Sequence, residues 1–301
     1  MNCKTMNAKR IWILALLITG AHRFACGQSD RPTPAELIRL TVRNELASDG
    51  GMGQNFMFCD HKKTQHATET KALVETHIAT AGLVVARNGK PLSGSEQNAE
   101  HSREQRFVSS PSELQAKVHR EQEDRDHTLQ IMKALPDAFL YEQAGTLPGT
   151  DTLGRQGDEL VRLNFRPNPK YDPPSRVEQV LTGLKGYVLV DAKEHRIARI
   201  DGTLFRDVEF GWGILGRLNQ GGHFLVEQAD VGDGQWEITH MRLSLQGRVL
   251  LVKRLAMESD EIFTGFRKVP STISFAEGLK MLETDDPCVL SQPSQSSTGS
   301  R

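Results

Sequence analysis

The sequence has few of the residue patterns on which catalysis usually depends. It contains four cysteines, of which only Cys59 and Cys288 lie beyond the first thirty residues, and neither belongs to a C-x-x-C pattern. The ten histidines are scattered, without an H-x-x-x-H or H-E-x-x-H spacing that would place two imidazoles at a metal. Ser109-Ser110 lacks the G-x-S-x-G turn that exposes a nucleophile. We therefore expect no enzyme, no metal site and no cofactor.

A surplus of charge of one sign is also missing. The formal net charge is −1, with a pI of about 6.8. Nucleic-acid-binding proteins usually carry a basic surplus on one face, so no nucleic-acid partner is expected. The glycine-rich stretch Gly211–Gly216 superficially resembles a phosphate-binding loop. No Lys-Ser/Thr closes it and no clear helix follows it, so nucleotide binding is not expected.

Only one long apolar run is present, and it lies near the start of the chain. Ile11–Gly20 follows the basic residues Lys4, Lys9 and Arg10 and precedes the small residues of Ala25-Cys26-Gly27. This order is typical of a secretory signal peptide, which we place at residues 1–27. A retained anchor is the alternative, although a bilayer span needs about 20 apolar residues. We expect export to the periplasm or outer envelope, with lipid modification of Cys26 as a variant.

The two remaining cysteines leave a choice that the sequence does not settle. In an oxidising compartment Cys59 and Cys288 could form a disulfide. Their Cα atoms would have to approach within about 7 Å, which depends on the fold. Two unpaired cysteines are the alternative.

The first half of the chain mixes helical and strand-like patterns. Apolar residues at helical spacing predict a helix over Ala35–Ser48. Two strand-like stretches follow, from Phe56 to Thr70 and from Ala72 to Arg87. Residues from about 94 to 134 are rich in charge and predict one or two solvated helices, interrupted near Ser109-Ser110-Pro111.

The second half predicts successive antiparallel strands. Short alternating runs are separated by turn residues every 8–12 positions; in Glu159–Arg166, for example, Val161, Leu163 and Phe165 face one way. Further strands are expected over 186–190, 195–205, 222–231, 235–245, 248–256 and 261–266. We predict one α+β domain over residues 28–284, mainly antiparallel β, with a strongly curved sheet or unclosed barrel whose concave face is covered by helices. Residues 285–301 are expected to be a disordered tail.

The segment Val208–Leu218 combines apolar residues with glycines between two expected strands. One interpretation is a flap over the mouth of an apolar cavity. The other is a corner of the sheet, where glycines permit the bend and the apolar side chains complete the core. The second interpretation is favoured by the glycines.

Several stretches resemble a family of uncharacterised exported bacterial proteins, which in turn resemble the lipoprotein-carrier (LolA/LolB-like) superfamily. The resemblance covers roughly Ala35 to Lys268 and is carried by Leu83–Ser93, Leu135–Phe139, Leu163–Pro169 with Tyr171, Gly183–Gly186 and Phe210–Gly216. It implies an unclosed antiparallel barrel whose concave face is covered by helices and whose cavity holds acyl chains. No motif of the carriers' key residues matches here, and the long charged helix and Trp212 segment are departures.

These observations lead to one functional hypothesis and one alternative. The hypothesis is an envelope binding protein that holds a lipid or lipoprotein acyl chain in its half-barrel, where apolar contact suffices because each buried CH₂ contributes about 0.8 kcal/mol. The alternative is a non-catalytic structural or interaction protein of the envelope, with a self-filled sheet and a protein partner. The predicted ligand-binding residues are Phe210, Trp212, Ile214, Leu215, Phe224 and Val226.

Overall fold

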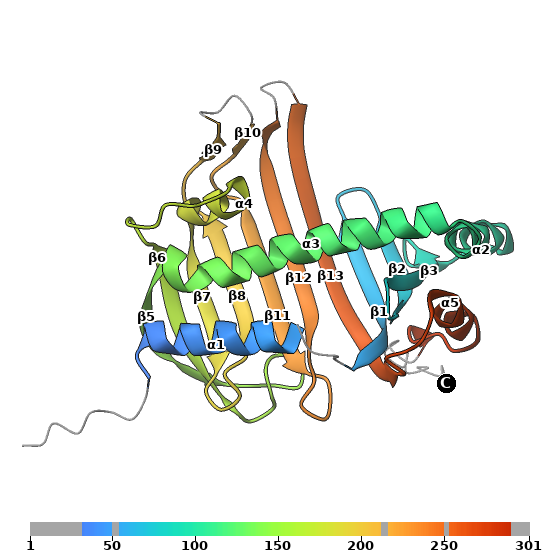
Figure 1. Ribbon diagram of the computed structural model, residues 1–301, viewed down its shortest axis with the longest axis horizontal. Helices are drawn as coiled ribbons and strands as arrows, with labels where there is room; N and C mark the ends of the chain where they lie inside the picture. The colour runs from blue at the N-terminus through green and yellow to red at the C-terminus, as the bar shows by residue number, and fades with distance from the viewer. Residues whose placement is uncertain (1–31, 50–53, 212–215, 250–252, 290–301) are drawn as a thin grey trace, which may run out of the picture. The chain divides into compact units, whose positions relative to one another are not determined.

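In the computed structural model, the described strands of the chain form one antiparallel sheet (Figure 1). The structure describes residues 32–49, 54–211, 216–249 and 253–289. Within them the strands are β1 (Asn55–Thr64), β2 (Thr68–Glu75), β3 (Thr80–Arg87), β4 (Lys90–Pro91), β5 (Phe139–Pro148), β6 (Glu159–Pro167), β7 (Leu184–Asp191), β8 (Ile197–Leu204), β9 (Val208–Phe210), β10 (Gly216–Leu218), β11 (His223–Asp230), β12 (Trp236–Val249) and β13 (Lys253–Val269).

The strand order shows that the sheet is not closed on itself. The path is β4-β3-β2-β1-β13-β12-β11-β8-β7-β6-β5, with the β9–β10 hairpin attached to β12. The end strands β4 and β5 are not neighbours on this path, and the named strands pair antiparallel throughout. The first strand, β1, pairs with the last, β13, so segments far apart in the sequence meet at the centre of the sheet. The predicted α+β class, with an unclosed and mainly antiparallel sheet, is confirmed.

The helices are α1 (Pro34–Asp49), α2 (Gly94–Ser109), α3 (Pro111–Ala138), α4 (Arg176–Gln179) and α5 (Phe275–Thr284), with a 3₁₀ turn at Val180–Gly183. The helices α1, α2 and α3 begin and end close to the predicted positions, whereas α4 and α5 were not predicted from the sequence. The interruption between α2 and α3 falls at Ser110, and Pro111 opens α3, where a missing N–H costs nothing. In the described part of the chain, no helix combines the length and apolar character that a membrane crossing requires.

A single row of cross-strand neighbours identifies the two faces of the sheet. Residues directly opposite each other on paired strands point to the same side. The row passes from β6 to β3 through Leu163, Val188, Ile200, Val226, Met241, Glu261, Lys62, Glu69 and Arg87. We call the side that carries this row the inner face and the other side the outer face.

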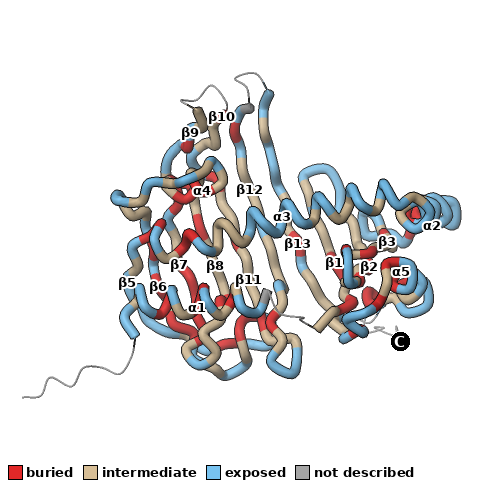
Figure 2. The backbone as a smooth tube through the Cα atoms, viewed as in Figure 1, coloured by how far each residue is buried: buried red, intermediate tan, exposed pale blue. Residues whose placement is uncertain are grey.

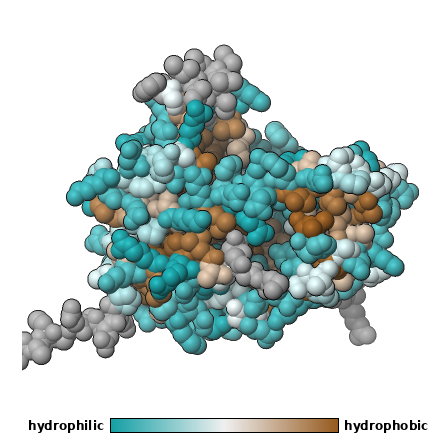
Figure 3. Space-filling view, viewed as in Figure 1, coloured by the Kyte–Doolittle hydropathy of each residue, from teal (hydrophilic) through white to brown (hydrophobic). Residues whose placement is uncertain are grey.

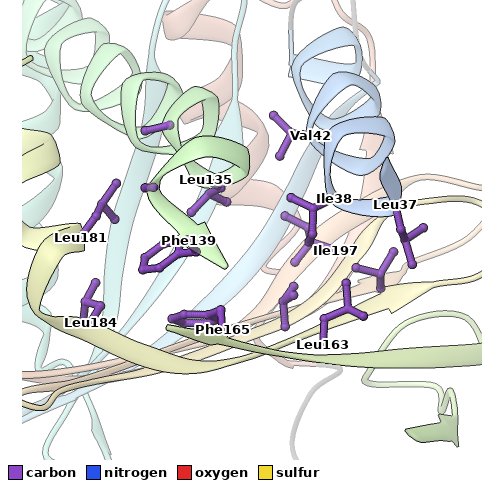
Figure 4. Packing of buried hydrophobic residues seen from close by; sticks show 14 of the residues in the cluster. Leu37, Ile38, Val42, Leu135, Phe139, Leu163, Phe165, Leu181, Leu184 and Ile197 are labelled. Atoms are coloured by element: carbon purple, nitrogen blue, oxygen red, sulfur yellow. The ribbon is translucent and has the colours of Figure 1, made fainter. Parts of the chain in front are cut away.

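The inner face is filled by helices over β5–β8. Leu37, Ile38 and Val42 of α1 pack with Leu135 at the end of α3 and with Leu163 of β6 (Figure 4). The alternation predicted for β6 is confirmed, because Val161, Leu163 and Phe165 all belong to this core. Glu45 of α1 adds a polar anchor: its carboxylate accepts hydrogen bonds from the Arg196 guanidinium and from the Ile197 backbone N–H. The inner face is thus covered by helices at this end.

A second core lies on the outer face of β1–β3. The residues Cys59, Ala72 and Val74 pack there against Phe275 and Leu279 of α5. Gly278 permits this close approach, because a Cβ there would lie 2.9 Å from Val74 Cγ1. Cys59 and Cys288 form a disulfide with their Cα atoms 5.0 Å apart, which settles the choice that the sequence left open. The bond ties the end of the domain to β1.

The α2 helix and the start of α3 protect the edge of the sheet. Unpaired N–H groups on an edge strand are a liability for aggregation. The carboxylate of Glu100 in α2 accepts a hydrogen bond from the Val84 N–H of β3, and that of Glu121 in α3 accepts one from the Thr80 N–H. The charged helices therefore have a structural task along β3.

Three sequence expectations need correction. The two stretches from Phe56 to Thr70 and from Ala72 to Arg87 are three strands, β1, β2 and β3, because turns at residues 65–67 and 76–79 interrupt them. The expected strand over 248–256 is divided, since Arg248 and Val249 end β12 and Lys253 begins β13, which continues through the expected strand over 261–266 to Val269. Residues 285–289, assigned to the tail, are held by the ion pair of Asp285 with Arg267 and by the Cys288 disulfide. The predicted leader and residues 290–301 lie outside the described residues.

Candidate ligand-binding site

The middle of α3 is exposed on every side. All seven residues of Gln122–Thr128 are exposed, and seven consecutive residues cover almost two turns of a helix. No side of this segment is therefore buried against the sheet. At its two ends, α3 contacts α2 on one side and α1, α4 and β5 on the other. Between those ends it crosses in front of β12 and β13 (Figure 1).

The strands in this central region present apolar side chains that are only half-buried. On the inner face these are Val226 of β11 with Met241 and Leu243 of β12. Two rings from β1 and β13 continue the surface, Phe58 and Phe263, with centroids 6.0 Å apart. We call the inner-face residues Phe58, Phe224, Val226, Met241, Leu243 and Phe263 the central inner surface. Figure 2 shows the contrast: burial is dense at both ends of the sheet and sparse along β12 and β13.

Figure 3 shows separate hydrophobic areas at the surface of this side of the molecule, with hydrophilic residues between them. A polar helix above an apolar surface differs from the rest of the inner face, where α1 and the end of α3 bring apolar residues to the contact. Of the central inner surface, Phe224 packs against this core, whereas the other five members belong to no hydrophobic core among the described residues.

The inner face changes from apolar to charged between β12 and β1. Next to Met241 the cross-strand row continues with Glu261 and Lys62, whose side chains form a 2.9 Å ion pair. Asp60 lies one pair further along β1; it is 5% exposed, and its Oδ1 has no hydrogen-bond partner among the described residues. Burial, reinforced by the nearby Glu261 carboxylate, raises the pKa of Asp60 to about 6. One end of the surface is thus suited to an alkyl chain and the other to a polar group.

The buried Asp60 carboxyl gives a pH-dependent stability. Its pKa is raised in the folded state, so the folded protein holds the proton more tightly than the unfolded chain. Stability is therefore lost as the pH rises from about 3.8 to about 6 and stays lost above that range. We expect Asp60→Asn to be more stable than the unsubstituted protein at pH 7.5, with the difference shrinking towards pH 4. Urea unfolding at several pH values measures this; a constant difference across that range would contradict the assignment.

Two carboxyl groups in another part of the structure, those of Glu75 and Glu237, have pKa values raised by burial. Glu75, at the end of β2, accepts a hydrogen bond from the Phe56 N–H, and Arg125 of α3 is close enough to favour its charged form. Burial and the charge of Glu75 together raise the pKa of Glu237, in β12, to about 8, while Arg196 opposes the shift. These interactions place the exposed middle of α3 near the end of β2.

The predicted ligand-binding residues are only partly brought together. Phe224 and Val226 both lie on the inner face of β11. The Phe224 ring covers Gly202 of β8, where an added Cβ would lie 2.2 Å from a ring carbon. Phe210, at the end of β9, packs against the core that α1 covers, as the corner interpretation expects. Trp212, Ile214 and Leu215 lie outside the described residues.

Sequence reasoning missed most of the central inner surface. Met241 and Leu243 alternate with polar residues in β12, which is a readable signal for one apolar face. The sequence does not indicate that Phe263 is a neighbour of Phe58. Their strands are separated in sequence by almost the whole domain, and only the β1–β13 register brings them together. A bulge at Gly265 then brings Phe266 to the same side, where it stacks on Phe58 at 5.3 Å.

No protein-family model and no curated protein matches this chain.

Proposed function

We propose that the protein binds a hydrophobic ligand, a lipid or the acyl chain of a lipoprotein, between the central inner surface and α3. The exposure of all seven residues of Gln122–Thr128 above half-buried apolar strands is the observation that carries this proposal. An alkyl chain placed there would cover Val226, Met241 and Leu243 without any polar contact. Each buried CH₂ contributes about 0.8 kcal/mol, so a long chain supplies its own affinity.

The charged end of the surface fits the polar part of such a ligand. Lys62 and Glu261 lie directly beside Met241 in the cross-strand row. A head group or peptide at that end would meet charged side chains while the alkyl chain lies on the aromatic and aliphatic residues. This amphiphilic pattern supports a lipid or acylated ligand over a uniformly apolar molecule.

The proposal includes export to the cell envelope and a role in binding without catalysis. The Cys59–Cys288 disulfide supports export, because structural disulfides form in oxidising compartments. The amino-terminal signal-peptide pattern points the same way. The resemblance to lipoprotein carriers supports the same kind of ligand, since those proteins hold acyl chains in a half-barrel.

The test compares one substitution on each face of the sheet. In Leu243→Lys, an ammonium group would enter the proposed ligand surface, and we expect at least a tenfold loss of co-purifying lipid, measured by native mass spectrometry of protein recovered from membranes. Ile262→Lys is the matched control, because Ile262 pairs with His240 on the outer face and is 47% exposed. Its lipid content should equal that of the unsubstituted protein.

Two results would overturn the proposal. If unsubstituted protein carries no lipid and takes up none from detergent-solubilised lipid, the surface is not a lipid site. That result would support the alternative, a structural or interaction protein whose sheet is filled by its own residues, as the β5–β8 end already is. Equal lipid loss in both lysine variants, at equal thermal stability, would likewise place the ligand elsewhere.

A further inference from the structure

Three arginines stand in one row across neighbouring strands at the end of the sheet where β9 and β10 lie. Arg217 of β10 is directly opposite Arg248 of β12, and Arg248 is directly opposite Arg254 of β13. Arg248 and Arg254 alternate with the inner-face positions of their strands and therefore point to the outer face. Both are exposed. We call these three residues the arginine row.

The row is only partly neutralised by the protein. Arg217 has acidic neighbours, since Asp207 lies 3.4 Å away and Glu209 is its cross-strand neighbour on β9. No ion pair or hydrogen bond of the Arg248 or Arg254 side chain is found among the described residues. The sequence from 247 to 257 contains no acid. Glu258, the next acid, is on the same face but accepts a hydrogen bond from Gln65.

Such a row is unfavourable for the isolated protein. Like charges directly opposite each other on paired strands destabilise a sheet by about 0.2–1 kcal/mol for each pair. Neighbouring strands lie about 4.8 Å apart, so the row extends over about 10 Å. Guanidinium groups match phosphate oxygens with two parallel hydrogen bonds, and this makes arginine the preferred residue for phosphate recognition. A row of this length can contact several phosphates that lie in one plane.

We propose that the arginine row binds the phosphate groups of anionic lipids at a membrane surface. A single free phosphate could occupy only one gap in the row, whereas a lipid surface presents phosphates along its whole length. The site is open on the side of β13 that pairs with β1. Because β1 ends at the Thr64–Ser259 pair, the first residues of β13 have no neighbouring strand on that side among the described residues.

The proposed site consists of the arginines alone. The proposal does not depend on a ligand in the central inner surface.

The experiment is co-sedimentation of the full chain with vesicles of phosphatidylcholine, with or without phosphatidylglycerol. Near an anionic surface each basic residue contributes about 1 kcal/mol, which corresponds to about fivefold in affinity. We expect Arg248→Gln/Arg254→Gln to lower the affinity for the anionic vesicles by about 30-fold and to leave the affinity for phosphatidylcholine unchanged. The leader is the same in every variant, so its contribution cancels.

The matched control is Arg242→Gln, which removes an equal charge per residue from the same face of β12. Arg242 is paired with Asp260 at 3.0 Å, so its loss should reduce vesicle binding less than Arg248→Gln alone. The double variant should unfold at the same temperature as the unsubstituted chain or a higher one, because it relieves repulsion. A lower unfolding temperature would indicate a structural role and contradict the proposal.

Two further outcomes would overturn the membrane assignment. If the double variant sediments with anionic vesicles as well as the unsubstituted chain, the row is not the contact. If inorganic phosphate abolishes vesicle binding at constant ionic strength and binds with similar affinity on its own, the row is a site for free phosphate. Sedimentation that resists phosphate but falls with rising salt supports the lipid surface.

Discussion

Replacing both disulfide cysteines, in Cys59→Ala/Cys288→Ala, is expected to lower the free energy of unfolding by about 2–5 kcal/mol. The two residues are separated by 229 positions in the sequence, so the bond restricts a very large loop in the unfolded chain. Because the entropic benefit grows with loop length, the loss should lie towards the upper end of this range. Guanidinium unfolding of the oxidised protein and of the double variant measures the difference.

Reduction provides the control for this experiment. Dithiothreitol should lower the stability of the unsubstituted protein to about that of the double variant and should leave the variant itself unchanged. Both cysteines are buried, so the reductant should act mainly through partly unfolded molecules. An unchanged unfolding midpoint in the double variant would show that the bond contributes nothing to stability.

Glu45→Ala is expected to destabilise the protein by about 3–5 kcal/mol, because it breaks a buried ion pair and leaves its partners unsatisfied. The Glu45 side chain is 8% exposed and accepts two hydrogen bonds at 3.0 Å from Arg196. The same carboxylate accepts the Ile197 N–H at 2.7 Å, so its loss also leaves a buried backbone donor without an acceptor. Since Glu45 joins α1 to β8, thermal unfolding monitored by circular dichroism will report the loss directly.

Arg39→Ala is the matched control on the same helix. Arg39 and Asp137 are 3.8 Å apart, and both side chains are largely exposed. Exposed ion pairs typically contribute about 0–1 kcal/mol, so this variant should unfold close to the unsubstituted protein. Similar losses in Arg39→Ala and Glu45→Ala would show that general weakening of α1, rather than the buried carboxylate, determines stability.

The local pattern of the sequence predicted the elements better than their partners. Alternation in β6 correctly placed Val161, Leu163 and Phe165 in the core, because the two faces of a strand differ in burial. Leu160, on the opposite face, is also fully buried, under the segment that contains Leu153. Alternation could not indicate this second core, since it depends on a loop folding back over the outer face.

The candidate site was harder to predict than the fold for the same reason. Phe224 and Val226 were found from their own strand, whereas Phe58 and Phe263 become neighbours only through a pairing between distant segments. The segment around Trp212 was predicted to bind ligand because of its composition, but composition does not indicate which strands lie beneath α3. The arginine row could not be predicted for a similar reason, because only the strand registers place its members next to one another.

The pairing of β1 with β13 also constrains the order in which the molecule can fold. The strands β1–β3 reach the rest of the sheet only through β13, the last strand of the chain. Because the chain is synthesised from its amino-terminal end, these three strands cannot join the rest of the sheet until nearly the whole domain has been made. Contacts between such distant segments slow folding, because a long loop must close before they form. The pairing of β1 with β13 is therefore expected to be a late and slow step in folding.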